Sequence, residues 1–215
     1  MHSMKKHLFV LLTLSIFFPG CNNVEREFEF SYPQIPSIIQ EDVLRRAYLA
    51  EHFWDNIPWN DTTITVSMDK LRKHFYEYLS LINETGLSRA NVLLNDLASK
   101  ASSAPCSFTE PLLILFDESL NHPNSPMRHE GLYISVIDVY IENLPVESPI
   151  REKLKWEREL LIKNSIGKVA EDFSILFEDG GVVKLHKIES ELTLLYFFEP
   201  DCNSCKEGVF LAENN

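Results

Sequence analysis

Two cysteines near the C-terminus, Cys202 and Cys205, have the residue type and spacing best suited to chemistry in this chain. They follow an apolar run at 192–199 that is rich in β-forming residues and stops at Pro200. This order predicts a buried strand that delivers a Cys-x-x-Cys pair to the first turn of a helix. At a helix N-terminus, unpaired backbone N–H groups and the positive end of the dipole stabilise a thiolate. Cys202 would attack a partner disulfide, and Cys205 would then resolve the mixed disulfide.

The Cys-x-x-Cys pair also has two plainer interpretations, half of a zinc site or two unrelated buried thiols. A structural zinc site needs four ligands, which usually come from a second such pair. The sequence has no second pair and no histidine after Cys205. The histidines show no His-x-x-x-His or His-Glu-x-x-His spacing, and His52, beside Phe53-Trp54, is interpreted as a buried or half-buried side chain with one hydrogen bond. We therefore expect neither a metal nor a cofactor, and no Gly-rich phosphate loop or paired-carboxylate motif stands out.

The first twenty residues have the features of an export signal. Lys5 and Lys6 precede an apolar run at 8–18 that is too short to span a bilayer, and Pro19-Gly20-Cys21 follows. This arrangement resembles a bacterial lipoprotein signal peptide, a resemblance that implies lipidation of Cys21 as the first residue of the mature protein. The alternative is an ordinary secretory signal with an incidental cysteine. Both interpretations place the protein outside the cytoplasm.

The charge balance limits the partners. The chain has 20 Lys and Arg against 32 Asp and Glu, a formal net charge of −12. Such an acidic chain repels phosphate backbones, so we expect no nucleic acid, and membrane association would rest on acyl chains at Cys21. Beyond Cys21 the cysteine count is odd, which suits one redox pair plus a bystander, Cys106, better than a structural disulfide framework.

Residues 37–163 have the pattern of an all-α helical array. Apolar side chains recur at helical spacing between serine, glycine and proline breaks, without a strict repeat period. Residues 21–36, with mixed charge, aromatics and two prolines, are predicted to be a tether with at most a short edge strand. The six helices are predicted to start near Ser37, Ser67, Ser88, Thr109, Ser125 and Ser148.

The pattern changes near 164 to that of strands. Phe173, Ile175 and Phe177 alternate with their neighbours at a period of two. Asp179-Gly180-Gly181 predicts a hairpin turn, because its glycines supply positive φ, and Val182 begins the return strand. The overall class is therefore predicted to be α+β, with a domain boundary near 164.

The C-terminal part resembles the start of a TlpA-like thioredoxin domain. The residues that carry the resemblance are Gly167 to Phe173, Asp179-Gly180, Leu185, Leu194 to Phe198 and Cys202-x-x-Cys205. It implies a thiol–disulfide oxidoreductase of which the β-hairpin, the central strand and the start of the CxxC helix are present. It also implies a later βα unit and a cis-proline strand, yet ten residues follow Cys205, so we expect a truncated domain with impaired activity. The stretch from Tyr48 to Asn56 resembles a domain of unknown function often found ahead of such domains.

The sequence thus predicts a signal peptide at 1–20, a tether at 21–36, a helical domain at 37–163 and a truncated thioredoxin-like domain at 164–215. The protein is expected in the bacterial cell envelope, lipid-anchored and facing the periplasm or at the outer membrane. Its expected partners are protein disulfides or a membrane thiol-reductant chain. The alternative is a non-enzymatic binding or scaffold module carried by the helical domain.

Overall fold

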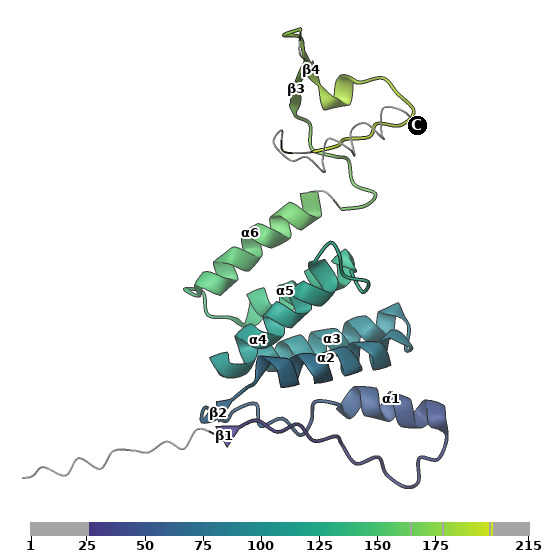
Figure 1. The fold of residues 1–215 in the computed structure, drawn as a ribbon, viewed down its shortest axis with the longest axis vertical. Helices are drawn as coiled ribbons and strands as arrows, with labels where there is room; N and C mark the ends of the chain where they lie inside the picture. The colour runs from purple at the N-terminus through teal and green to yellow at the C-terminus, as the bar shows by residue number, and fades with distance from the viewer. Residues whose placement is uncertain (1–25, 164, 178, 198, 200–215) are drawn as a thin grey trace, which may run out of the picture. The chain divides into compact units, whose positions relative to one another are not determined.

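The computed structural model describes residues 26–163, 165–177, 179–197 and 199, and the chain separates into two compact units, Met1–Ile162 and Lys163–Asn215. The described residues form a mixed, helix-rich structure (Figure 1). No helix among them is both long and apolar enough to cross a membrane. The helices are α1 (Asp42–His52), α2 (Met68–Asn83), α3 (Leu87–Ser102), α4 (Cys106–Phe116), α5 (Glu130–Asn143) and α6 (Pro149–Lys163). A π-helical turn, Asp117–Asn121, follows α4 directly.

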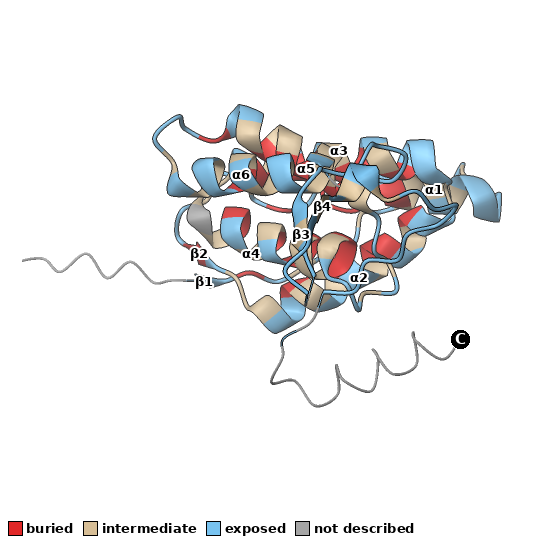
Figure 2. Ribbon diagram, turned by 90° about the horizontal axis from the view of Figure 1, so that it is seen from above, coloured by how far each residue is buried: buried red, intermediate tan, exposed pale blue. Residues whose placement is uncertain are grey.

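The core of the first unit forms around α3, which contacts α2, α4 and α5. Its buried face carries small residues, among them Ala98 and Ala101 at 0% exposure, which let neighbouring helices approach closely. The stripe predicted on α2 is buried, with Phe75 at 0% and Tyr78 at 2% exposure. Figure 2 shows buried positions on the facing sides of these helices and exposed positions outside. The apolar spacing of the sequence therefore predicts the core faces correctly.

Three helices begin where the sequence predicts and three do not. Helices α2 and α6 start directly after Ser67 and Ser148, and α3 starts after Gly86, whose φ of +83° favours glycine. Helix α1 begins at Asp42 rather than near Ser37, since residues 36–39 form a turn instead.

Helix α4 begins before its predicted start and α5 after it, because the side chains predicted to cap these helices make tertiary contacts instead. Helix α4 begins at Cys106, and the Thr109 hydroxyl donates to the Ala101 carbonyl at 2.8 Å, which ties α4 to α3. Helix α5 begins at Glu130, capped by the His129 side chain, whose Nδ1 accepts from the Leu132 N–H at 3.1 Å. Ser125 donates to the Ser119 carbonyl. The hydroxyl groups of Thr109 and Ser125, which could each cap a helix, therefore bind carbonyl groups of other segments instead.

The described part of the predicted tether, from Arg26 onward, packs on the helical unit, so this prediction is wrong for these residues. Strand β1 (Arg26–Glu27) pairs in parallel with β2 (Ile64–Thr65). Phe28 is 7% exposed and meets Phe108 of α4 edge-to-face, with ring centroids 5.6 Å apart. The burial of aromatic surface outweighs the freedom that a solvated spacer would keep.

The second unit contains the predicted hairpin. Strands β3 (Ser174–Leu176) and β4 (Val182–Lys184) pair antiparallel, with Ile175 opposite Val183, and Gly180 in the turn has a φ of +86°. A short 3₁₀ helix, Leu185–Lys187, follows. No residue of this unit is buried within the part that the structure describes.

The strand predicted at 192–199 is not formed by the described residues of that segment, 192–197 and 199. Leu192 and Leu194 are 87% and 77% exposed. A strand is defined by hydrogen bonds to a neighbour, and none of the described strands pairs with this segment.

Candidate functional site

The predicted catalytic pair, Cys202 and Cys205, and the predicted lipidation site, Cys21, lie outside the described residues. Their roles therefore stay predictions. Cys106, interpreted as a bystander, is the first residue of α4.

The segment that leads toward the cysteine pair turns back onto the hairpin. The rings of Phe173 and Phe197 lie 6.2 Å apart between centroids, and Ser190 and Thr193 share a hydrogen bond of 2.8 Å between their hydroxyls. The residues before the hairpin are fastened to those after it, since the His186 N–H donates to the Asp172 carboxylate at 3.1 Å. These contacts tie the described residues of 170–177 and 179–197 to one another.

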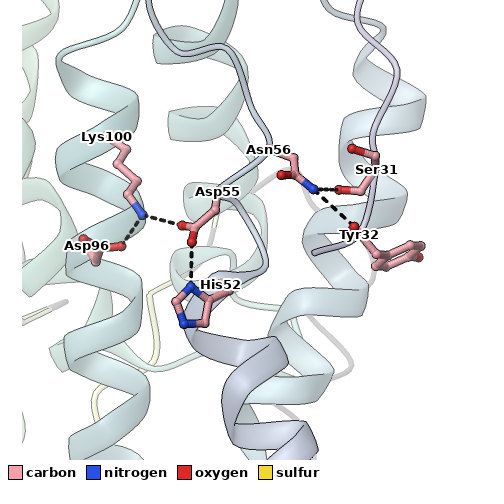
Figure 3. A network of polar contacts seen from close by, with 7 residues as sticks. All are labelled: Ser31, Tyr32, His52, Asp55, Asn56, Asp96 and Lys100. Atoms are coloured by element: carbon pink, nitrogen blue, oxygen red, sulfur yellow. Dashed lines mark hydrogen bonds and ion pairs between the residues drawn. The ribbon is translucent and has the colours of Figure 1, made fainter. Parts of the chain in front are cut away.

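A polar network in the first unit is the most connected cluster of ionisable side chains near the end of α1 (Figure 3). His52 Nδ1 lies 2.6 Å from Asp55 Oδ2, and the other Asp55 oxygen lies 3.5 Å from Lys100 Nζ. Lys100 also pairs with Asp96 at 2.8 Å. The His52 ring lies over Tyr48, with centroids 4.2 Å apart.

An imidazole whose Nδ1 faces a carboxylate has the orientation of a general base. Catalysis would also need a nucleophile within hydrogen-bond reach of His52. Within this network, no serine, threonine or cysteine side chain is hydrogen-bonded to His52. The His52 and Asp55 side chains are 38% and 44% exposed. The arrangement is better explained as a tie between the end of α1 and α3, with the one hydrogen bond for His52 that the sequence predicts.

The loop that follows α1 also holds the N-terminal segment, residues 26–32, in place. The Asn56 amide donates to the carbonyls of Ser31 and Tyr32, both at 3.2 Å (Figure 3). Tyr32 in turn donates its hydroxyl to Glu77 Oε2 at 2.7 Å, and His74 Nδ1 lies 2.9 Å from the same oxygen. Residues 26–32 are therefore held to the helical unit by polar contacts as well as by Phe28.

These contacts shift the two pKa values in opposite directions. The hydrogen bond from Tyr32 holds the pKa of the Glu77 carboxyl below its ordinary value, with the His74 hydrogen bond adding to this effect. The same bond to the carboxylate raises the pKa of the Tyr32 hydroxyl. Because both shifts favour a neutral phenol beside a carboxylate, the hydrogen bond from Tyr32 to Glu77 is present at neutral pH.

No group of three or more His, Cys, Asp or Glu side chains among the described residues could hold a metal ion. The first unit does contain a cavity of about 310 Å³ beside the α2–α3 turn. Sequence reasoning missed it, because its walls come from segments near 79–94, 120 and 126–132 that show no shared local pattern.

Comparison with known proteins gives two matches. Residues 8–164 match a family described as a domain of unknown function, DUF5106. A solved structure titled as a thioredoxin-like protein from Bacteroides caccae is similar over 83% of this chain, with 28% sequence identity and a TM-score of 0.64. The match covers 64% of that protein, so this chain spans less than two thirds of its length. No curated protein matches the chain.

Proposed function

Because the chain belongs to the DUF5106 family, whose role is unknown, and resembles a thioredoxin-like protein, we propose that it is a thiol–disulfide oxidoreductase. Cys202 would be the attacking thiol and Cys205 the resolving one. The carrying observation is the structural match over 83% of the chain. The first unit holds 162 of the 215 residues, about three quarters, so a match of this extent includes part of both units. The Cys-x-x-Cys motif then supplies the chemistry that such a fold supports.

The proposed reaction is a dithiol–disulfide exchange. The Cys202 thiolate attacks one sulfur of a partner disulfide, forms a mixed disulfide and releases the partner's other thiolate, which takes up a proton. Cys205 then attacks Cys202 Sγ, releases the second partner thiol and leaves a Cys202–Cys205 disulfide. The partner is reduced by two electrons and the protein is oxidised by two. A thiol reductant, expected to be a membrane chain of dithiols, must restore the reduced pair.

We further propose that the protein is exported and lipid-anchored at Cys21, in the cell envelope. The packing of residues 26–32 supports a short connection, because only four residues lie between Cys21 and Arg26, which is five Cα–Cα steps. Fully extended, this stretch spans at most about 17 Å. The anchor would thus hold the helical unit close to the membrane surface.

The redox proposal is tested first by mapping the disulfide that forms at equilibrium and then by measuring the rate of disulfide reduction. In glutathione buffers, alkylation and mass spectrometry should find an intramolecular Cys202–Cys205 disulfide, while Cys106 stays a thiol. With dithiothreitol as reductant, the wild-type chain and Cys106→Ser should reduce insulin disulfides faster than Cys202→Ser. Cys106→Ser is the matched control, because it removes a thiol without touching the pair. Pairing of Cys106 with either C-terminal cysteine, or equal rates for wild type and Cys202→Ser, contradicts the proposal.

One observation favours a second function, a binding or scaffold module. Every buried residue of the described chain lies between Phe28 and Leu154, within the first unit. This unit therefore has a complete core for an independent role. A cell carrying the double variant Cys202→Ser and Cys205→Ser should then behave as wild type, whereas the redox proposal predicts loss of function.

A further inference from the structure

The cavity beside the α2–α3 turn has an apolar interior. Its least exposed lining residues are Leu94, Ile82, Leu120 and Leu79, which are 1%, 2%, 3% and 4% exposed. Met127 lines it from the loop before α5. These side chains belong to the core of the first unit, so the cavity is held by packed helices and not by a mobile tip.

The edge of this cavity is cationic and polar. Arg128 and His129 line it from exposed positions, and Asn83 lies at the end of α2. None of the lining residues is an aspartate or glutamate, although the chain as a whole carries a net charge of −12. Arg128 therefore places a cation at the edge of a lining that has no carboxylate, although Glu130, outside the lining, lies 3.9 Å from this arginine.

Both edge residues keep hydrogen-bonding capacity for a ligand. The ion pair of Arg128 within the described residues is with Glu130, at 3.9 Å, which is too long for a good hydrogen bond. His129 Nδ1 accepts from the Leu132 N–H at 3.1 Å, so the ring proton of the neutral imidazole lies on Nε2. That N–H is a donor at an exposed position.

We propose that this cavity binds a small apolar carboxylate, with the apolar body among Leu79, Ile82 and Leu94 and the carboxylate at Arg128 and His129. An apolar interior with a few convergent polar groups is the usual composition of a ligand site. The volume of about 310 Å³ accommodates roughly ten non-hydrogen atoms at about 30 Å³ each. One cationic edge matches one anionic end. This site belongs to the helical unit and is independent of Cys202 and Cys205.

Octanoate, which has an eight-carbon body and one carboxylate, is a suitable probe. The full chain labelled with ¹³C at methionine methyl groups provides the reporter, because Met127 lines the cavity whereas Met68 starts α2 and does not line it. Octanoate should shift the Met127 methyl signal in a saturable way, with Kd on the order of 1 mM, and leave Met68 unmoved. Octanol should bind about tenfold more weakly, and acetate should not shift Met127.

Two charge variants distinguish a direct contact of octanoate with Arg128 from the effect of lowering the positive charge anywhere on the chain. Arg128→Gln should weaken octanoate about tenfold and leave octanol unchanged, because it removes a charge-assisted hydrogen bond. The control is Arg26→Gln, which removes another exposed, ion-paired arginine, on β1 and outside the cavity lining, and should not change binding. Cys202→Ser with Cys205→Ser should bind octanoate as wild type does, so the outcome is separate from that of the redox proposal.

Three results would overturn the proposal. The first is no saturable shift of Met127 with octanoate up to 20-fold above the expected Kd. The second is octanol binding as tightly as octanoate in the wild-type chain, an arm that needs no variant to fold. The third is an equal loss of affinity in Arg128→Gln and Arg26→Gln.

Discussion

Three buried tyrosines should make the helical unit sensitive to alkaline pH. Tyr78, Tyr133 and Tyr140 are 2%, 1% and 0% exposed, and burial raises the pKa of each hydroxyl far above its ordinary value of about 10. Nearby carboxylates raise it further at Tyr133, where Asp117 and Glu157 oppose a second negative charge. Their hydroxyls donate to the Leu93 carbonyl, the Glu157 carboxylate and the Thr109 carbonyl, and a phenolate could not donate.

The sign and size of the effect follow from proton linkage. A group with a raised folded pKa adds stability that is fully present below the unfolded pKa and is lost as pH rises above it. At pH 11 an unfolded tyrosine gains about 1.4 kcal/mol from ionisation, which its buried counterpart does not. Three such groups remove about 4 kcal/mol from a total that is typically about 5–15 kcal/mol. The free energy of unfolding should therefore fall by up to about 4 kcal/mol per further pH unit above 11.

The assay is urea unfolding followed by circular dichroism at 222 nm between pH 8 and 11.5. Tyr140→Phe should lower the pH dependence by about a third, because two buried hydroxyls remain, while removing one buried hydrogen bond at all pH values. Tyr76→Phe, at a side chain 40% exposed, is the matched control and should leave the slope unchanged. Phenolate absorbance at 295 nm should show three of the seven tyrosines ionising only as the chain unfolds.

The explanation fails if all seven tyrosines ionise in the folded chain below pH 11. It also fails if Tyr140→Phe and Tyr76→Phe change the slope by the same amount.

Three further outcomes test other parts of the first unit. Phe28→Ala should destabilise the unit by about 3 kcal/mol, and a fragment of residues 26–163 should unfold at higher urea than one of residues 37–163; equal midpoints would show that the N-terminal segment adds nothing. Tyr32→Phe should raise the pKa of Glu77 toward its ordinary value, as followed by ¹³C NMR of the carboxyl carbon, since the lost hydrogen bond favours the charged form; an unmoved pKa would assign the shift to His74 instead. Gly86→Ala should cost about 1 kcal/mol in urea unfolding through strain at φ +83° alone, because nothing lies within 4 Å of the added Cβ; a stabilised variant would contradict this account.

The sequence predicts what is local and misses what is made across the chain. The α2 stripe and the hairpin turn at Gly180 depend on periodicity and on positive φ, and both are present. The burial of Phe28 depends on Phe108, and on a strand pairing with residues 64–65, neither of which leaves a mark in residues 21–36. The start of α4 depends on Thr109 reaching α3.

The prediction of a strand at 192–199 failed for the same reason, because a strand depends on a partner elsewhere in the chain. This failure matters most for function. Its apolar composition predicts burial, yet Leu192, Leu194 and Phe197 are 87%, 77% and 79% exposed. Covering such a side chain contributes about 2 kcal/mol, so a surface that covered all three would contribute about 6 kcal/mol, as much as many whole domains possess. Cys202 and Cys205 lie outside the described residues, and we expect their environment to depend on what pairs with and covers this segment. Periodicity in one chain segment reports that such a surface is needed, but not which residues supply it.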